Sequence, residues 1–333
     1  MENLVRHRYI WFALSLIMIL PGLYFLLLHP LVTEGQFRIG LRPSIDFSGG
    51  ALWEISFPQA TIDSLNTDEI AQVFAENGFD QAQVQLSNTE IEGKQIATAL
   101  VRTVALSASD PNSQQEAVLQ GLRAKYGEVQ RERLESVGAT VSQESTRSAI
   151  IAVIAASLVI MFYLTASFRK APHPFRYGAC AIIAMLHDVI LILGVASILG
   201  VFIDMEVDAL FLTALLTIIS FSVHDTIVVF DRIRENLLNR RSNQTFDEIV
   251  NLSIAQTMPR SLNTQLTSIF TLVALLMFGG DSIRNFVLIL LIGMLSGTFS
   301  SIFNAAQLLV VWEHKEWRNW FGRGKHEVEE AAA

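Results

Sequence analysis

The sequence predicts an α-helical polytopic membrane protein that crosses the bilayer six times and carries one inserted α+β domain. Its 333 residues are 51% hydrophobic and 17% charged, a more apolar balance than a soluble chain of this length usually shows. Six apolar runs are each long enough to cross a bilayer, which takes about 20 residues. The stretch between the first two runs instead has the strand and helix patterns of a water-soluble domain.

The six apolar runs define the expected spans. The first follows two arginines and looks like a secretory signal, but its apolar stretch is longer than that of a typical signal and no small-residue cleavage site follows. We therefore expect a retained anchor with a local kink at Pro21 and Gly22. The expected spans are Tyr9–Leu28, Ala149–Phe168, Tyr177–Ile203, Ala209–Phe230, Leu262–Phe278 and Phe286–Trp312.

Basic residues predict how the chain is oriented. Lys and Arg concentrate before the first span, between the second and third, between the fourth and fifth, and after the sixth, whereas the short loops on the other side hold only Arg284. Because basic loops stay on the cytoplasmic side, we expect both termini in the cytoplasm. The expected parts are residues 1–29 (N-terminus and first helix), 30–147 (extracytoplasmic α+β domain), 148–313 (helices two to six) and 314–333 (cytoplasmic tail).

The inserted domain is expected to be ferredoxin-like. Asn66 or Thr67 can cap a helix that ends at Gly78, and Gly127 can end a second helix. Together with four strand-like segments these give the order βαββαβ, which is that of a ferredoxin-like unit. The strands are expected at residues 51–57, 82–87, 95–104 and 129–137, and the second helix at 112–126.

This domain offers few groups for catalysis. It has no histidine between Pro30 and Arg147, no cysteine and no Gly-rich phosphate loop, so nucleophilic or metal chemistry has few candidates there. Gly49 and Gly50 are suited to a tight turn into the first strand, because glycine readily takes positive φ. We expect a module that binds or moves, and neither an enzyme nor a bound cofactor. No basic stripe indicates nucleic acid as a partner.

Three charged residues are expected to form a polar layer inside the membrane. Counted from the outer end of its span, Asp188 lies about 14 residues deep, Asp225 about 16 and Arg260 about 18. At about 1.5 Å per residue these depths differ by only about 6 Å. Charged groups at the centre of a membrane helix cost roughly 3 kcal/mol each, so those present are candidates for function.

This layer suggests a proton switch. While Asp225 faces Arg260 the acid stays ionised, and when the two separate it takes up a proton. Thr264 lies four residues after Arg260, on the same helix face, and is placed to pass a hydrogen bond along. Asp188 and His224 are further candidates for the proton path, and the proton is the expected coupling ion.

Structural interpretations remain open for these residues. Asp225 and Arg260 can simply hold two helices together, and Asp188 can serve packing alone. His187 and His224 each precede an aspartate, which raises the idea of a metal site. Neighbouring helix positions diverge by about 100°, however, so each dipeptide aims only one side chain at a given point, and we expect no bound metal.

Two further features of the spans are expected to serve packing. Gly293 and Gly297 form a GxxxG pair, which is typical of a close helix contact. Cys180 is the only cysteine and lies in an apolar run, so we expect a small core residue and no disulfide within the chain.

Four segments carry motifs of a known family. The longest is Val223–Asn236, which reads VHDTIVVFDRIREN, and Ile45–Gly50 is similar to an IDFTGGT motif. Leu186–Asp188 matches an LHD motif, and Arg260–Thr264 is similar to RTLNT. These motifs resemble those of the SecF family, the smaller subunit of the SecDF protein-export pair, over nearly the whole chain.

The resemblance implies a fold, partners and a location. It implies an RND-type half of six helices that pairs with SecD, binds the SecYEG channel and uses the proton gradient to help draw unfolded preproteins outward. Membrane lipid would surround it, in the bacterial inner (plasma) membrane or in a thylakoid. In that family the residues matching Asp225 and Arg260 lie on the proton path, and Thr264 falls where a supporting polar residue is expected.

Two positions depart from the family pattern. His224 stands where the family commonly has Asn, and a histidine there can itself titrate beside Asp225. The usual VGPxVG before the second helix reads Val137–Ser142, VGATVS, which suggests a different hinge between domain and membrane.

Two other functions compete with protein export. An RND-type exporter half for lipid or another small solute would share the fold and the proton pair. An intramembrane enzyme has less support, because the chain has no GxGD motif, no HExxH motif and no recognisable serine–histidine motif.

Overall fold

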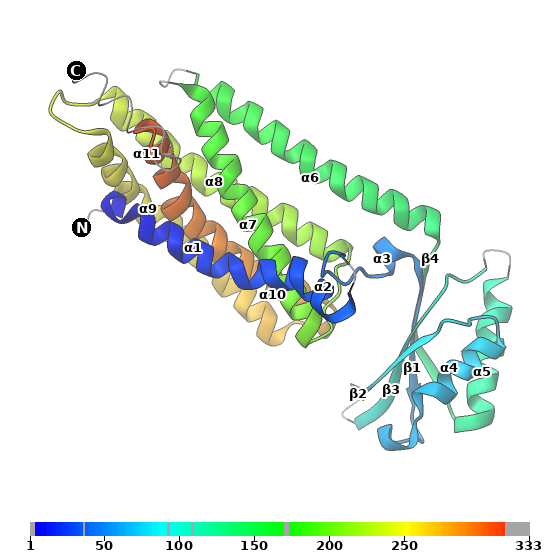
Figure 1. Cartoon of the computed structure of the whole chain (residues 1–333). Helices are drawn as coiled ribbons and strands as arrows, with labels where there is room; N and C mark the ends of the chain where they lie inside the picture. The colour runs from blue at the N-terminus through cyan, green and yellow to red at the C-terminus, as the bar shows by residue number, and fades with distance from the viewer. Residues whose placement is uncertain (1–3, 36, 92–93, 108–109, 170–172, 317–333) are drawn as a thin grey trace. The chain divides into compact units, whose positions relative to one another are not determined.

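The computed structural model describes residues 4–35, 37–91, 94–107, 110–169 and 173–316. The chain divides into two compact units (Figure 1). The helical unit consists of Met1–Arg42 and Ile151–Ala333, and the α+β unit is Pro43–Ile150.

Within these described ranges, six helices are long and apolar enough to cross a membrane, in agreement with the expected number. The first span consists of η1 (Leu4–His7), α1 (Arg8–Leu23), the π turn η2 (Tyr24–Leu28) and α2 (His29–Glu34). The next four are α6 (Ala139–Ser167), α7 (Pro174–Phe202), α8 (Ala209–Leu238) and α9 (Phe246–Phe278). The last consists of α10 (Asp281–Ser300), the π turn η4 (Ser301–Ala305) and α11 (Ala306–Glu313).

Helix α9 starts much earlier than its apolar run suggested, at Phe246 instead of Leu262. Its first turn is closed by a capping box, in which Thr245 Oγ1 accepts from the Glu248 backbone N–H and Glu248 Oε2 accepts from that of Thr245. Arg260 therefore lies inside this helix and not at its start.

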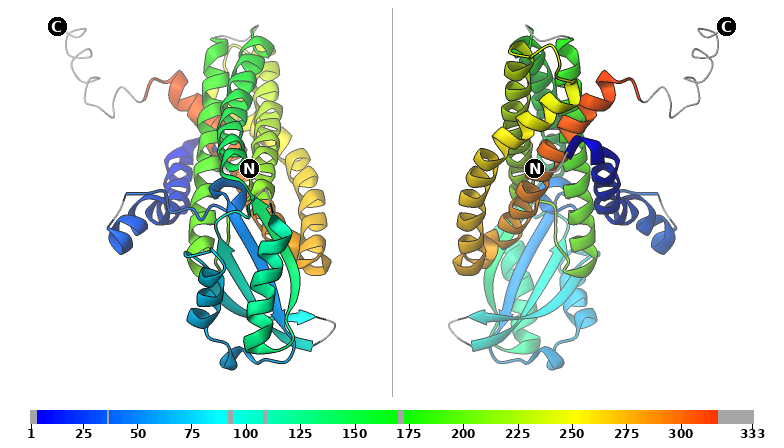
Figure 2. Two further views of the ribbon diagram at one scale, coloured as in Figure 1. Left: turned by 90° about the vertical axis from the view of Figure 1, so that its right-hand side faces the viewer. Right: turned by 90° about the vertical axis from the view of Figure 1, so that its left-hand side faces the viewer.

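The helices of this unit are buried to different degrees. Among the apolar stretches, those of α7, α8 and α10–α11 are 44%, 50% and 56% buried, whereas those of the first span, α6 and α9 are only 17%, 6% and 11% buried. Figures 1 and 2 show the long helices running alongside one another, and α10 packs against α7, α8 and α9. The inner helices therefore form the core, and the others leave apolar surface for lipid or for another chain.

Close helix packing depends on glycines at two places. Helices α1 and α7 meet where Gly22 faces Gly194, and a Cβ at Gly194 would lie 2.6 Å from Gly22 Cα. Helix α10 approaches α8 at Gly293 and Gly297, and a Cβ at Gly297 would lie 3.2 Å from Ser222 Cβ. The expected close contact of the GxxxG pair is confirmed.

The α+β unit contains a four-stranded antiparallel sheet in the order β2-β3-β1-β4. Trp53 and Ile55 of β1 pack in one core with Phe74 of α4 and Leu122 of α5. Both helices therefore cover the same face of the sheet. The elements are α3 (Ile45–Ser48), β1 (Gly50–Phe57), η3 (Ile62–Ser64), α4 (Thr67–Glu76), β2 (Gln83–Ile91), β3 (Lys94–Thr103), α5 (Pro111–Tyr126) and β4 (Gln130–Val137).

Local signals in this unit act as the sequence suggested. Asn66 caps α4 by accepting a hydrogen bond from the Asp68 backbone N–H, and Gly127 ends α5 with a φ of 81°. Gly49 and Gly50 take φ values of 75° and 115° in the turn before β1. A side chain at Gly50 would meet the Thr103 carbonyl oxygen at 2.6 Å, so both the conformation and the space require glycine.

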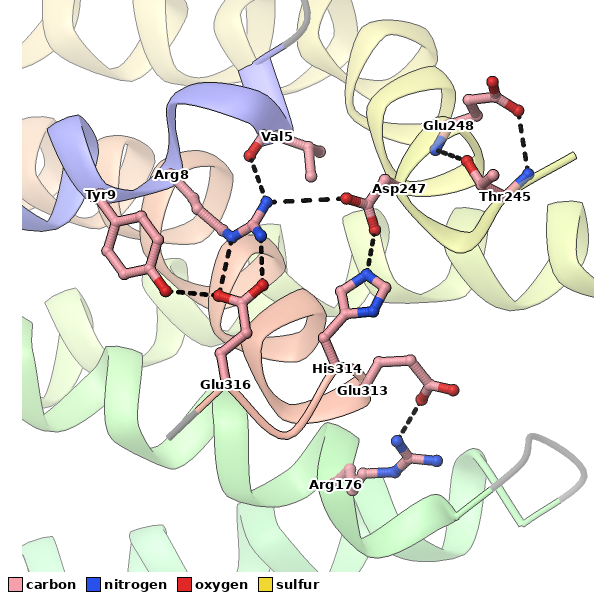
Figure 3. A network of polar contacts seen from close by, with 10 residues as sticks. All are labelled: Val5, Arg8, Tyr9, Arg176, Thr245, Asp247, Glu248, Glu313, His314 and Glu316. Atoms are coloured by element: carbon pink, nitrogen blue, oxygen red, sulfur yellow. Dashed lines mark hydrogen bonds and ion pairs between the residues drawn. The ribbon is translucent and has the colours of Figure 1, made fainter. Parts of the chain in front are cut away.

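Polar contacts join both ends of the helical unit's chain to α9 and α7 (Figure 3). Arg8 of α1 pairs with Glu316, which also accepts a hydrogen bond of 2.6 Å from Tyr9. Asp247, at the start of α9, lies 3.7 Å from Arg8 and 2.5 Å from His314 Nε2. A separate ion pair joins Arg176 of α7 to Glu313.

We expect Gly194→Ala to lower the free energy of unfolding by about 1–3 kcal/mol, the usual range for overpacking. The added methyl group meets the backbone of Gly22, which cannot turn aside as a flexible side chain does. Thermal unfolding of the purified protein in detergent measures this. Gly138→Ala is the matched control, because nothing lies within 4 Å of a Cβ there. Equal stability of the two variants would contradict the packing of α1 on α7.

We expect the contribution of Glu316 to stability to depend on pH. Burial raises the pKa of Glu316, but the hydrogen bonds from Arg8 and Tyr9 and the charge of Arg8 outweigh this and hold the pKa below its ordinary value. The stabilisation is thus complete above the unfolded pKa of about 4.3 and is lost as the pH falls through the lower folded pKa.

The measurement is the difference in unfolding temperature between wild type and Glu316→Gln as a function of pH. It should be largest at neutral pH and shrink below about pH 4. Glu235→Gln, which removes an exposed carboxylate paired with Arg232 on the same helix, controls for the loss of a surface charge. A difference that persists in acid would contradict an ionised Glu316.

Candidate functional site

Asp225 lies on the inner face of α8 and is only 3% exposed. Its Oδ2 accepts a hydrogen bond of 2.8 Å from Nε2 of Gln265 on α9. The carboxyl group is therefore held by a neutral amide in the interior of a membrane-length helix bundle. Gln265 Oε1 and Ser261 Oγ, one turn earlier on the buried face of α9, have no hydrogen-bond partner among the described residues.

The expected ion pair between Asp225 and Arg260 is absent from the described part of the chain. Arg260 is exposed, whereas Gln265 is 2% exposed. Five residues on a helix turn the side chain by about 140°, so Arg260 and Gln265 point to different sides of α9. Depth counted along the chain carries no information about the side of a helix on which a residue lies, and the expected pair fails on that point.

Thr264 stays with Arg260 on the exposed side of α9. Its hydroxyl group donates a hydrogen bond of 3.0 Å to the main-chain carbonyl of Arg260, as serines and threonines often do within helices. This structure therefore places neither residue in contact with Asp225.

Asp188, on α7, is fully buried and lies in a shell of hydroxyl groups. Its Oδ2 accepts hydrogen bonds from Ser222 of α8 at 2.6 Å and from Ser300 of α10 at 2.5 Å. Its Oδ1 accepts one from Ser296 of α10 at 2.8 Å and lies 3.1 Å from His187 Nδ1. Asp188 therefore joins three helices.

Two further hydroxyl groups bond to the backbone of Ser222, which belongs to this shell. The Ser222 main-chain carbonyl accepts hydrogen bonds from Thr226 at 3.0 Å and from Ser301 at 2.9 Å. Thr226 also donates to Ser301 at 3.0 Å. Ser301 begins the π turn η4, and such turns are frequent at functional sites.

His224 points away from these two carboxyl groups. It is exposed and lines a groove of about 630 Å³ between α6 and α8, together with Tyr163 and Ser220. The side chains of neighbouring residues on a helix point about 100° apart. His224 therefore faces the groove while Asp225 faces the core, and the two His-Asp dipeptides do not meet at one point. Within the described ranges no group of three or more His, Cys, Asp or Glu side chains could hold a metal ion.

The shell around Asp188 is the part of the site that the sequence did not reveal. Serines are common in apolar helices and are usually bonded to their own helix, so single serines gave no signal. The spacing of Ser296 and Ser300, four residues apart on the helix that carries Gly293 and Gly297, was the available clue. It placed two hydroxyl groups on the close-packed face.

Comparisons with known proteins agree on one family. The family model described as "Protein export membrane protein SecD/SecF, C-terminal" matches residues 117–315. The protein translocase subunit SecF of Thermobaculum terrenum is 46% identical over 98% of this chain and 99% of its own length. The protein translocase subunit SecDF of Bacillus subtilis is 35% identical, and the match covers 84% of this chain but only 35% of that protein.

Solved structures give the same result. The crystal structure of SecDF, a translocon-associated membrane protein from Thermus thermophilus, matches with a TM-score of 0.72 at 28% identity. The match covers 94% of this chain and 39% of that chain. Sequence and structure together establish that this chain belongs to the SecF family of protein translocase subunits.

Proposed function

We propose that this chain couples proton flow through the membrane to the export of preproteins, as an auxiliary subunit of a Sec translocase. The observation that carries the proposal is the buried carboxyl group of Asp225, which faces a neutral amide on the same helix, α9, that carries Arg260. Such an intramembrane acid is a functional candidate by default. Membership of a family of protein translocase subunits suggests that the proton would drive protein export.

The switch follows from the two faces of α9. Burial of Asp225 without a charged partner favours the protonated acid, although the amide N–H of Gln265 offsets part of this by donating to the carboxyl group, whereas the guanidinium of Arg260 would favour the carboxylate much more strongly. Turning α9 about its axis would exchange the first partner for the second and release the proton. Little of the apolar stretch of α9 is buried, so few packing contacts of that stretch oppose such a turn. Thr264 moves with Arg260, because the two are hydrogen-bonded.

We infer that a SecD subunit supplies the other half of the machine. The relative named SecDF is a single chain of which this chain matches 35%, so six helices make up only part of that protein. The apolar surfaces left open by α1, α6 and α9 are available for such a partner and for lipid. The SecYEG channel and an unfolded preprotein complete the expected assembly.

The α+β unit is proposed to act on the outer side of the membrane. Its element order supports a ferredoxin-like unit, and basic loops favour cytoplasmic termini, in a bacterial inner membrane. Since it has few groups for catalysis, we propose that it moves or holds the exported chain and needs no cofactor other than the proton.

We expect Asp225→Asn to abolish gradient-dependent export while the protein remains inserted. Asn keeps the shape of the side chain and its contact with Gln265 but cannot bind and release a proton. The measurement is the accumulation of unprocessed secretory precursors in a deletion strain that carries the variant. Asp231→Asn is the matched control on the same helix, because Asp231 is exposed and pairs with Arg234 at 2.7 Å.

Arg260→Met tests the other half of the switch and is expected to match Asp225→Asn. Wild-type export by either variant would contradict proton coupling through this pair. Normal secretion in the deletion strain, with altered membrane lipid, would instead favour an exporter of lipid. A double substitution that restored export would reveal a structural pair.

We expect Gln265→Leu to lower the free energy of unfolding by about 1–3 kcal/mol, because it leaves a buried carboxyl group without its donor. Thr264→Val, at the preceding position, removes only an exposed hydroxyl group bonded within its own helix and should change stability by less than about 0.5 kcal/mol. Thermal unfolding in detergent compares the two. A larger loss for the threonine variant would contradict the orientation of α9.

A further inference from the structure

We propose that the free edge of strand β4 and the pocket beside it bind an extended segment of the exported polypeptide, which pairs with β4 as an added strand. The α+β unit would thereby hold the exported chain through its main chain. The proposal rests on the proposed export function, because that function brings an unfolded chain to this unit.

The first step is the position of β4. It is an edge strand of the sheet and pairs with β1 on one side only. In an antiparallel ladder the main-chain N–H and C=O groups of successive residues point alternately to one side and to the other, so part of those of β4 point away from β1. Among the described residues, no main-chain group outside the sheet bonds to β4. Such an edge is ready to pair with another strand.

The second step is the part of β4 that stays regular. The register of β4 on β1 shifts between Glu54 and Ile55, so Glu132 is an extra residue on β4. Bulges and charges hinder the pairing of an edge strand, and the first half of β4 has both. The register is regular again after the bulge. We therefore place the added strand along Arg133–Val137.

The charged side chains of this second half lie on the face of the sheet away from the core. Leu134 is opposite Trp53, whose side chain is in the core of the unit, so both point to the helix-covered face. Arg133 and Glu135 point to the other face, where Arg133 Nε donates to Glu135 Oε1 at 2.8 Å. Their charges offset each other and leave the core side of this half of β4 uncharged.

The third step is the pocket. It has a volume of about 510 Å³ and lies beside β4 at the start of α5. Leu134 and Ser136 line it from the strand, and Leu106 and Pro111 line it from the segment between β3 and α5 and from α5 itself. Leu106 is held there, because its main-chain N–H donates to Ser136 Oγ at 3.0 Å.

A free strand edge beside such a pocket is the arrangement that binds peptides by strand addition. The paired main chain supplies affinity, and pockets take alternate side chains. Successive side chains of an added strand point to opposite faces, so every second one would point to the side of the pocket. The apolar side chains of Leu106 and Leu134 favour an apolar side chain there.

The fourth step is the choice of occupant. Main-chain pairing needs no particular sequence, and the pocket is also lined by Arg131 and Glu132, one charge of each sign. The site therefore suits a chain whose sequence changes as it passes. Folded proteins protect their strand edges, whereas the N–H and C=O groups of an unfolded polypeptide are open to pairing. An exported chain meets this condition while it is unfolded.

The test uses the full-length protein in lipid nanodiscs with one reactive cysteine in the pocket, Ser136→Cys. The chain's own Cys180 is 0% exposed, so it does not compete. The probe is a short synthetic peptide that alternates valine and threonine and carries an activated disulfide at its centre. Ser87→Cys is the matched control, because Ser87 is also exposed and lies on β2, the other edge strand of the sheet.

We expect the mixed disulfide to form faster at Ser136→Cys than at Ser87→Cys and to saturate with peptide concentration, because binding holds the two sulfur atoms together. Two further peptides are N-methylated at every odd or at every even residue. Only one set of N–H groups faces β4, so one of these peptides reacts like the parent. The other reacts about tenfold more slowly, as expected for the loss of one or two main-chain hydrogen bonds.

A second arm identifies the occupant in cells. Ser136→Cys is expressed in the deletion strain together with a secretory precursor that carries a single cysteine, and the expected result is a mixed disulfide between the two. The same capture is then tried with Ser136→Cys combined with Asp225→Asn. Capture with export lost supports both the site and the proton coupling, whereas capture with normal export removes the proton coupling and keeps the site.

The proposal is overturned by equal reaction at Ser136→Cys and Ser87→Cys, or by N-methylated peptides that both react like the parent. Capture of the peptide in nanodiscs without capture of a precursor in cells would overturn the exported chain as the occupant. Preferential reaction of Ser136→Cys with a second copy of itself would make β4 an interface between copies and overturn it as well. Should Ser136→Cys disturb the contact with Leu106, Ser107→Cys in the same pocket gives the same comparison.

Discussion

The close approach of α10 to α8 is the constraint on which the polar centre of the helical unit depends. Gly293 and Gly297 have no side chain to hold the two helices apart, so Ser222 comes within reach of both α10 and Asp188. With the helices further apart, the hydroxyl groups of Ser296 and Ser300 could not meet a carboxylate on α7. The hydrogen bonds around Asp188 thus follow from backbone proximity, which small residues allow inside a membrane.

Helix α9 stands in contrast to this closed centre. Near Asp225 it contacts the core through Ser261 and Gln265, while Arg260 and Thr264 face outward. The two faces of α9 thus carry two different possible partners for Asp225: the amide of Gln265 on the inner face and the guanidinium of Arg260 on the outer face. The same bundle therefore combines two different contacts on α8. Ser222 belongs to the closely packed contact with Asp188, and Asp225, about one turn after Ser222, makes the less tightly packed contact with α9.

Hydropathy and local signals predicted the number of spans, the order of elements in the α+β unit and the caps at Asn66 and Gly127, because these depend on neighbouring residues. The start of α9 was missed, since Phe246–Pro259 is too polar to read as a span although it is helical. The partner of Asp225 was also missed. Depth depends on residue count alone, but the side on which a residue lies depends on how α9 packs, which one sequence does not contain.

The π turn at Ser301–Ala305 has a consequence for how this chain can vary in length. One additional residue per turn there offsets everything that follows, so the face that carries Ser296 and Ser300 is not in simple register with the face that carries Gln307. Deleting one residue within that turn would close it to a regular α-helix and leave buried Gln307 on the same side, whereas a deletion elsewhere in α10 or α11 would rotate the part that follows by about 100°. A deletion in the loop at 239–244, before the Thr245 cap of α9, would disturb no helix face, so length differences among relatives should collect in that loop and, within the last span, be confined to the π turn.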